Sequence, residues 1–218
     1  MQNDAHSISR LVDVTINSLP FTAAHSILSV PKKFDGIKHI AAMPGLGEDI
    51  RVRTAIDLWE SDSRFSHLYI TGTNTNEKLQ PQLTIERLQQ YPYKLNKTEG
   101  VLAQVVADHT RAQTDWLVDQ LLMNGAESLI LCVSHWHMTR AYMTLVKSML
   151  NARMLIPVIP NVIGTAPNQI IPEVGQSVQK LSAGEAERIV KYSDTGQIVS
   201  SVELSEYLDW IWSSYLTD

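Results

Sequence analysis

The sequence lacks most of the features that assign a protein to a specialised class. Cys132 is the one cysteine among 218 residues, which excludes an internal disulfide framework and a cysteine-rich zinc site. No stretch reaches the roughly 18 consecutive apolar residues that a membrane-spanning helix needs, and the N-terminal segment lacks the apolar core of a signal peptide. The net charge is −5, whereas a nucleic-acid-binding chain is usually basic. We therefore expect a cytoplasmic protein with no membrane span and no nucleic-acid partner.

What the chain does have is the composition of an ordinary globular protein. Apolar residues make up 44% and charged residues 19% of the sequence, and it shows no internal repeat or low-complexity tract. This length and balance are sufficient for one buried core. The sequence therefore predicts a single domain over residues 1–218, with its core at about residues 37–161.

Five short apolar runs divide the middle of the chain. Each has the length of a strand and is nearly continuous rather than alternating, which is typical of strands buried on both faces of a parallel sheet. The runs are Ile37–Met43, His67–Thr71, Val101–Val106, Ser128–Val133 and Met154–Ile159. Cys132 lies inside the fourth run, where we expect it to be a small buried apolar residue.

Helical patterns separate these runs. Apolar residues recur at i, i+3, i+4 and i+7 from Val52 to Trp59 and again from Met138 to Met149. A third pattern, Thr110–Met123, ends at an Asn-Gly pair that is a typical helix stop, and Thr84–Gln90 is a weaker candidate. The alternation predicts a three-layer α/β Rossmann-like fold with a mainly parallel sheet of about five strands.

The two ends of the chain are predicted to add helices to this core. Residues 5–30 have a helical pattern that stops before a proline. Two serine–glutamate pairs, Ser182 with Glu185 and Ser200 with Glu203, have the spacing of capping boxes, which predicts C-terminal helices over residues 182–216. Residues 157–172 contain four of the nine prolines and predict an extended, functional loop.

Small and polar residues follow the apolar runs, at the sheet edge where α/β proteins bind their ligands. Gly45 and Gly47 form a G-x-G turn after the first run, which would bring an anion close to helix N–H groups. They can equally serve a tight turn, because the third glycine of the dinucleotide fingerprint is missing. The second run is followed by Thr71, Gly72, Thr73 and Asn74, which either contact a ligand or form a solvated turn.

The stretch Ser134–Arg140 after the fourth run is the richest in reactive side chains. His135 and His137 lie at i, i+2 and would point to the same side of an extended chain. A zinc site needs a third ligand and none is evident, so no metal is expected. A histidine here can instead act in acid–base catalysis or donate to an anionic ligand, or both can be structural.

Arginines and helix-start residues complete the candidate crevice. The third run contributes His109, Thr110 and Gln113, with Asp108 expected to cap the following helix. Arg53 and Arg140 fall in the first turns of two helices, and two guanidinium groups over one crevice suit a phosphate or carboxylate. The alternative is that each is ion-paired, Arg140 for instance with Asp108 or Glu48.

Together these residues resemble the YdcF-like family, which includes the SanA and ElyC proteins and is a domain of unknown function. The resemblance runs from about Ile37 to Asn161. Its most specific part is Val133–Ala141, which is similar to the family pattern V-T/S-x-x-H-M-x-R-A and places His137 and Arg140 on recurrent family positions. The resemblance implies a Rossmann-like fold and a crevice for a nucleotide-like or S-adenosylmethionine-like ligand.

The chain departs from this family at the third run. The family's glutamate and its S-x-N-T-x-E-N pattern fall here on Gln104, Ala107, His109, Thr110, Ala112 and Gln113. The threonine is kept, but both carboxylates are lost, at Gln104 and Ala112. An acid–base role for those glutamates therefore does not carry over.

Three functions fit these observations. The first is an enzyme that acts on a phosphorylated or nucleotide-like substrate, with Arg53 and Arg140 holding the anion and His137 as the acid–base group, assisted by His135 or His109. The second is a non-catalytic module for the same anionic small molecule, which the lost carboxylates favour. The third is a metal-assisted hydrolase that uses the two histidines. The candidate ligand-binding residues are Gly45, Gly47, Arg53, Thr71, Gly72, Thr73, Asn74, His109, Thr110, Gln113, Ser134 and Arg140.

Overall fold

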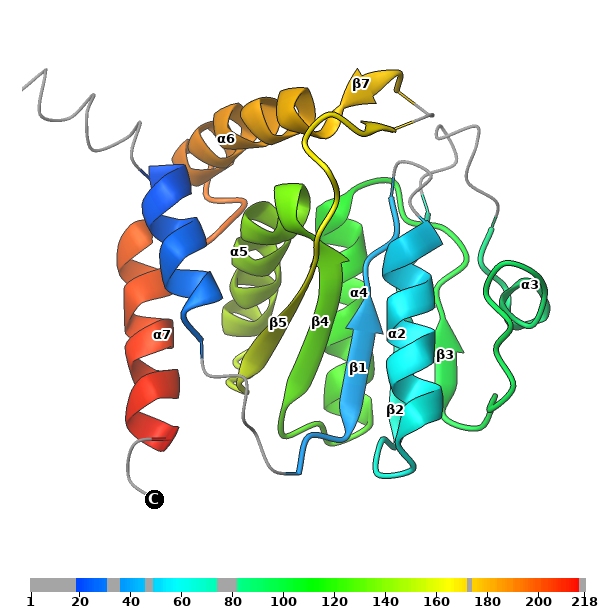
Figure 1. The fold of residues 1–218 in the computed structure, drawn as a ribbon. Helices are drawn as coiled ribbons and strands as arrows, with labels where there is room; N and C mark the ends of the chain where they lie inside the picture. Colours follow the sequence, from blue (N-terminus) through cyan, green and yellow to red (C-terminus); the bar gives the residue numbers. More distant parts are fainter. Residues whose placement is uncertain (1–18, 31–35, 46–48, 74–81, 172–173, 216–218) are drawn as a thin grey trace, which may run out of the picture.

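A computed structural model describes residues 19–30, 36–45, 49–73, 82–171 and 174–215. Its centre is a sheet of five strands in which every neighbouring pair is parallel, in the order β3-β2-β1-β4-β5 (Figure 1). The strands are β1 His39–Ala42, β2 His67–Ile70, β3 Val101–Ala103, β4 Leu129–Ser134 and β5 Val158–Ile163. This sheet confirms the predicted α/β Rossmann-like fold.

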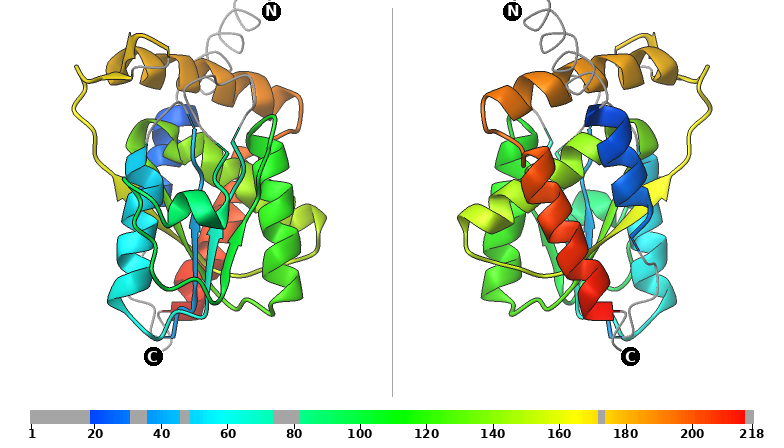
Figure 2. Two further views of the ribbon diagram at one scale, coloured as in Figure 1. Left: turned by 90° about the vertical axis from the view of Figure 1, so that its right-hand side faces the viewer. Right: turned by 90° about the vertical axis from the view of Figure 1, so that its left-hand side faces the viewer.

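Helices cover both faces of the sheet and produce three layers. Figure 2 shows α2 on one side of the strands and α4 on the other. The α2 face also holds the short α3, whereas α5, α7 and the helix at residues 19–28 join α4 on the opposite face. The helices are α2 Asp49–Ser61, α3 Ile85–Leu88, α4 Thr110–Met123, α5 His135–Asn151, α6 Val178–Asp194 and α7 Ser201–Tyr215. The bounds of α4 match the sequence-based prediction residue for residue.

One helix occupies a different position. α6 lies across the carboxyl ends of the strands, above the layers (Figure 1). It follows an antiparallel hairpin whose two strands, β6 Ile170–Ile171 and β7 Gln176–Ser177, have two residues each. It therefore covers the sheet edge at which parallel α/β proteins bind ligands.

The fifth strand begins four residues later than the run Met154–Ile159 predicts. Met154 and Ile156 are buried in the core without being strand residues, so their apolar character reflects packing of the connection beneath the helices. β5 is an edge strand, where Pro160 is tolerated because no further strand needs its missing N–H. Of the predicted loop at residues 157–172, residues 158–163 are strand and residues 170–171 belong to a hairpin, which leaves residues 164–169 as a loop.

The helix-start predictions had mixed outcomes. At Ser200 and Glu203 the capping box is confirmed, since each backbone N–H reaches the other side chain, at 2.8 and 3.2 Å. The pair Ser182 and Glu185 lies inside α6 instead, whose N-cap is Ser177, so that capping box is wrong. Of the helix predicted over residues 5–30, the described part is helical at residues 19–28 and residues 5–18 lie outside the described ranges.

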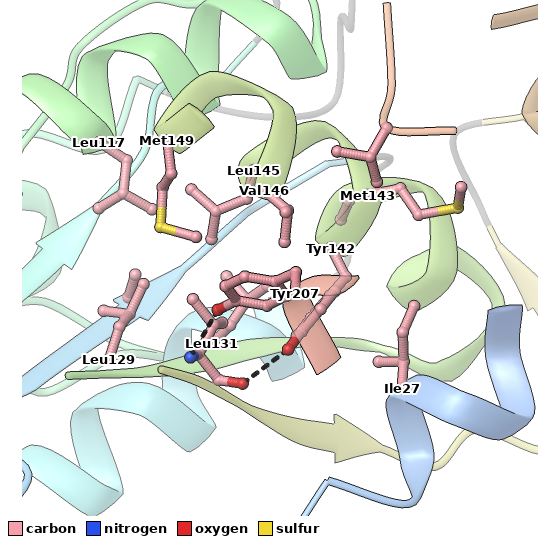
Figure 3. Close-up of a cluster of buried hydrophobic side chains, with 14 of the residues drawn as sticks. Ile27, Leu117, Leu129, Leu131, Tyr142, Met143, Leu145, Val146, Met149 and Tyr207 are labelled. Carbon is pink, nitrogen blue, oxygen red and sulfur yellow. Dashed lines mark hydrogen bonds between the residues drawn. The ribbon is translucent and has the colours of Figure 1, made fainter. Parts of the chain in front are cut away.

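The larger core cluster lies between the sheet and the α4–α5–α7 layer (Figure 3). Two tyrosines there satisfy polar backbone groups of the connection into β5. The Tyr142 hydroxyl donates to the Val158 carbonyl at 2.9 Å, and the Tyr207 hydroxyl bonds both Val158 N and the Ile156 carbonyl.

No helix among the described residues is long and apolar enough to cross a membrane.

Candidate functional site

A polar crevice of about 250 Å³ lies at the carboxyl ends of β1 and β4, beneath α6. These two strands are neighbours at the point where the strand order reverses, which is where open α/β sheets bind ligands. The crevice is lined by Pro44, Gly45, Arg51, Ala107, Asp108, His109, Thr110, Gln113, Trp136, His137, Arg140, Glu185 and Arg188.

The structure brings six of the fourteen predicted site residues together. Those that line the crevice are Gly45, His109, Thr110, Gln113, His137 and Arg140. Those that do not are Arg53, Thr71, Gly72, Thr73, Ser134 and His135, while Gly47 and Asn74 lie outside the described ranges. The crevice therefore draws on the segments that follow β1, β3 and β4, and on α6.

Arg51 occupies the place that the sequence analysis gave to Arg53. The Arg53 side chain is exposed, whereas Arg51 is 1% exposed. Arg51 Nε donates to Ser134 Oγ at 2.9 Å, its Nη1 donates to the Met43 carbonyl at 3.0 Å, and its guanidinium lies 4.9 Å from the Trp136 ring centre. Residues two apart on a helix face different ways, and only Arg51 shares the i, i+4, i+8 row with Ala55 and Trp59. That row was the signal for the correct arginine.

The segment after β2 holds the sheet edge together rather than lining the crevice. Gly72 N donates to Gln104 Oε1 at 2.9 Å, and its carbonyl accepts from Gln113 Nε2 at 2.7 Å. Gln113 Nε2 also donates to the Pro44 carbonyl at 3.0 Å, so one amide ties together the segments after β1 and β2. Thr73 pairs with Val106 in an isolated bridge. Both glutamines, at positions where the resemblance expects other polar residues, therefore make structural hydrogen bonds.

The two histidines after β4 point to different sides. α5 begins at His135, so the chain is already helical where the i, i+2 argument assumed an extended strand. His135 is exposed, with its Nδ1 3.2 Å from Thr165 Oγ1, whereas His137 is buried against the crevice. The described part of the chain contains no group of three residues able to hold a metal ion.

The helix starts around the crevice also differ from expectation. His109, not Asp108, is the N-cap of α4, and its Nδ1 accepts from Ala112 N at 3.1 Å. Asp108 is exposed at the crevice. Ser134 makes no side-chain capping bond to α5, because its hydroxyl accepts from Arg51 instead.

Glu185 is the functional candidate that the sequence analysis missed. It is 3% exposed, and its carboxylate receives four contacts. Oε2 lies 3.0 Å from His137 Nδ1 and 2.5 Å from Arg140 Nε, while Oε1 lies 3.1 Å from Arg140 Nη2 and 2.7 Å from Arg188 Nη1. Leu181 and Ile189 flank it at i±4 on the buried face of α6. A carboxylate on that apolar row was the available signal.

This carboxylate occupies the guanidinium fork of Arg140. The remaining amino group, Nη1, donates to Thr110 Oγ1 at 2.8 Å. Arg140 is thus ion-paired as the alternative interpretation held, but with Glu185 rather than with Asp108 or Glu48. Arg140 therefore lines the crevice as one partner of this ion pair.

The charge states follow from this geometry. Burial and, after it, the Arg140 charge together lower the pKa of His137 to about 4, against the opposing effect of Glu185. Burial raises the pKa of Glu185, but hydrogen bonds and charge from His137 and Arg140 outweigh it and hold that pKa well below its usual range. Near neutral pH the crevice therefore contains a neutral imidazole bonded to an ionised carboxylate.

The crevice carries the opposite charge to the protein as a whole. Among the described residues, its lining holds three arginines against Asp108 and Glu185, a formal charge of about +1 with neutral histidines, in a chain of net charge −5. Thr110 and His137, in the first turns of α4 and α5, both line it. Helix N-termini carry partial positive charge, so they add to the attraction for an anion.

The chain matches no protein-family model, no curated protein and no solved structure. The resemblance to the YdcF-like family therefore rests on the residues that suggested it. What the structure adds is an α/β fold with a five-stranded parallel sheet and a cationic crevice at its switch point.

Proposed function

We propose that the crevice binds an anionic small molecule of the phosphorylated or nucleotide-like class, and that His137 is the acid–base group acting on it. The observation that carries this proposal is a buried histidine, His137, in a cationic crevice at the switch point of the sheet, where burial lowers its pKa. A histidine that is neutral near pH 7 is able to accept a proton.

The anion is held from the α2 and helix-start side of the crevice. Arg51 contributes its guanidinium, and the first turns of α4 and α5 contribute partial positive charge. Gly45 lines the same side, where the absence of a side chain allows close approach. Arg140 acts indirectly, by fixing Glu185.

Membership of the YdcF-like family is part of this proposal. The support is the agreement between the residues that carry the resemblance and a Rossmann-like fold with His137 at the ligand edge. Nucleotides and S-adenosylmethionine-like molecules are accordingly the first ligands to test.

A non-catalytic binding module is the second candidate. The observation that favours it is that the side-chain amides of Gln104 and Gln113 form hydrogen bonds with backbone groups of neighbouring segments. Neither amide is therefore positioned for proton transfer. His137→Ala separates the two candidates, because an enzyme loses turnover with binding retained, whereas a binding module shows no turnover in either form.

The binding claim is tested with a matched pair of arginines. Inorganic phosphate, adenosine monophosphate and S-adenosylhomocysteine are titrated into the wild-type protein, Arg51→Gln and Arg53→Gln, with affinity measured by calorimetry and folding by the melting temperature. We expect Arg51→Gln to weaken phosphate binding about 10-fold or more, the range for a hydrogen bond to a charged group. Arg53→Gln is expected to leave it unchanged. Equal effects in the two variants, or no binding of any probe to the wild type, would contradict the proposal.

A further inference from the structure

His137 is held by a carboxylate from a distant part of the chain. Its Nδ1 lies 3.0 Å from Glu185 Oε2, and α6 delivers this oxygen across 48 positions of sequence. Side chains of both residues are less than a tenth exposed. The contact is therefore a buried hydrogen bond rather than a surface ion pair.

The chemistry of the pair fixes the position of one proton. An ionised carboxylate only accepts hydrogen bonds, so Nδ1 of a neutral His137 ring must carry the hydrogen. The other ring nitrogen, Nε2, is then the acceptor. Arg140 Nη2 also lies 3.2 Å from Nδ1, but it is a donor and cannot bond an Nδ1 that bears hydrogen.

We propose that Glu185 is a positioning residue that holds His137 in the Nδ1–H tautomer, with Nε2 as the atom that exchanges protons with the ligand. This inference rests on the proposed function for His137. The step it supports is proton transfer: Nε2 accepts the hydrogen of a ligand or water O–H, and the electron pair of the broken O–H bond stays on oxygen. The resulting imidazolium lies against the Glu185 carboxylate, which stabilises its charge.

In this role Glu185 supplies a carboxylate from a part of the chain other than the one that the resemblance indicates. The positions at which the resemblance expects glutamates hold Gln104 and Ala112. Glu185 comes from α6 instead, and Arg140 and Arg188 fix both of its oxygens. The two arginines keep the carboxylate ionised and in place.

The glutamine variant reverses the proton arrangement. In Glu185→Gln the charge is lost, and we expect Arg140 Nη2 and Arg188 Nη1 to take the amide oxygen, as they take Oε1 of the glutamate. The amide N–H groups then face Nδ1, so Nδ1 accepts and the hydrogen moves to Nε2. Glu185→Asp keeps the charge on a shorter arm. Glu187→Gln is the matched control, because Glu187 lies on the exposed face of the same helix.

The experiment reads the ring nitrogens of His137 directly. Long-range ¹H–¹⁵N spectra of the ligand-free protein at pH 7.5 are recorded for the wild type and the three variants, with His137→Gln used for assignment and inorganic phosphate affinity measured in parallel. We expect Nδ1–H to predominate in the wild type and in Glu187→Gln. Glu185→Gln is expected to give predominantly Nε2–H, and Glu185→Asp to restore Nδ1–H in part.

Two results would overturn the inference. One is a wild-type His137 with its hydrogen on Nε2, which is decisive even if Glu185→Gln fails to fold. The other is a folded Glu185→Gln whose tautomer is unchanged, which leaves Glu185 as an ion-pair partner of the arginines alone. Because the spectra need no ligand, failure of phosphate binding counts against the proposed function and not against the positioning role.

Discussion

Arg51 and Arg53 are separated by one residue, yet the first side chain is buried and the second is exposed. Helical geometry turns Arg51 into the buried row with Ala55 and Trp59, and it leaves Arg53 in solvent. The same geometry separates His135 from His137 once α5 begins at the first of them. At the scale of single residues, the function of each side chain therefore depends on which turn of which helix it occupies.

Gly72 has no side chain, and its importance also depends on its surroundings, because backbone atoms of a neighbouring segment lie close to it. A Cβ on Gly72 would lie 2.5 Å from the Val106 carbonyl carbon and 2.7 Å from Ala107 N, both backbone atoms. We expect Gly72→Ala to lower the free energy of unfolding by about 1–3 kcal/mol, because the two segments have to move apart. Urea unfolding measures this. Gly164→Ala is the control, since a Cβ there meets nothing within 4 Å, and a loss as large as that of Gly72→Ala would disprove the steric explanation.

Arg140 is expected to matter for stability, unlike an ordinary surface arginine. Arg140→Ala removes two donors from the buried Glu185 carboxylate, and breaking a buried pair in this way costs about 3 kcal/mol. Arg111→Ala breaks a more exposed pair with Asp115 and should cost less than about 1 kcal/mol. Thermal and urea unfolding of both variants test the difference. Similar small losses would mean that the Glu185 pair is no stronger than a surface pair.

At the scale of elements, the apolar runs predicted the order of strands and helices but not every boundary. β4 was placed to within a residue, because all of its apolar residues lie in the sheet. The run before β5 misled because Met154 and Ile156 are buried outside any strand. Ser182 and Glu185 had the spacing of a helix start, yet both lie inside α6. Local patterns indicate burial, and burial alone does not say which element provides it.

The site was harder to predict than the fold for a related reason. His137 and Arg140 were visible because they follow an apolar run directly. Glu185 meets Arg140 across 45 positions, and no local pattern encodes a contact at that distance. Six of the fourteen residues named for the crevice line it, whereas the segment after β2 serves to join neighbouring segments.

α7 offers a test of how helices are fixed to the sheet. The Tyr207 hydroxyl accepts from Val158 N at 3.1 Å and donates to the Ile156 carbonyl at 2.7 Å, both in a buried setting. Tyr207→Phe leaves these two backbone groups without that partner, so we expect a loss of about 1–3 kcal/mol in the free energy of unfolding. Tyr91→Phe, at a residue 79% exposed, should be neutral. Denaturant unfolding that finds the two variants alike would remove Tyr207 as a polar anchor of α7.

At the scale of the whole molecule, the layers place unlike groups at the two ends of the sheet. The carboxyl ends of the strands meet the cationic crevice and α6. At the other end, His39 and His67 stack at 5.1 Å between ring centres, and His39 Nδ1 lies 3.0 Å from the Tyr69 hydroxyl. Two buried histidines, His39 and His137, thus lie at opposite ends of one core.

These histidines predict how stability depends on pH. Burial, with the charges of His67 and Lys38, lowers the pKa of His39 to about 4. Burial, with the charge of Arg140, lowers the pKa of His137 to about 4 as well. Both titrate near 6.5 in the unfolded chain, so the unfolded state binds more protons between pH 6.5 and 4. The free energy of unfolding should therefore fall as the pH drops through this window, by up to about 1.4 kcal/mol per pH unit for each histidine.

Urea unfolding at half-unit steps from pH 7.5 to 4.5 measures that slope. His39→Phe keeps an aromatic ring in the stack and removes one titrating group. The free energy of unfolding of this variant should therefore fall less steeply with decreasing pH, by up to about 1.4 kcal/mol per pH unit, which corresponds to one proton. A free energy of unfolding that stays level down to pH 5 in the wild type would show that neither histidine is protected from protonation.

The position of Glu185 in the chain also sets when the crevice can work. Protein synthesis runs from the N-terminus, and early segments begin to fold before later ones emerge. All five strands of the sheet, together with Arg51, His137 and Arg140, are encoded before residue 164, and α6 follows only at Val178. A nascent chain can thus assemble the sheet and most of the crevice lining while His137 still lacks the partner that sets its proton. Translation of α6 then adds Glu185, the partner that we propose for His137.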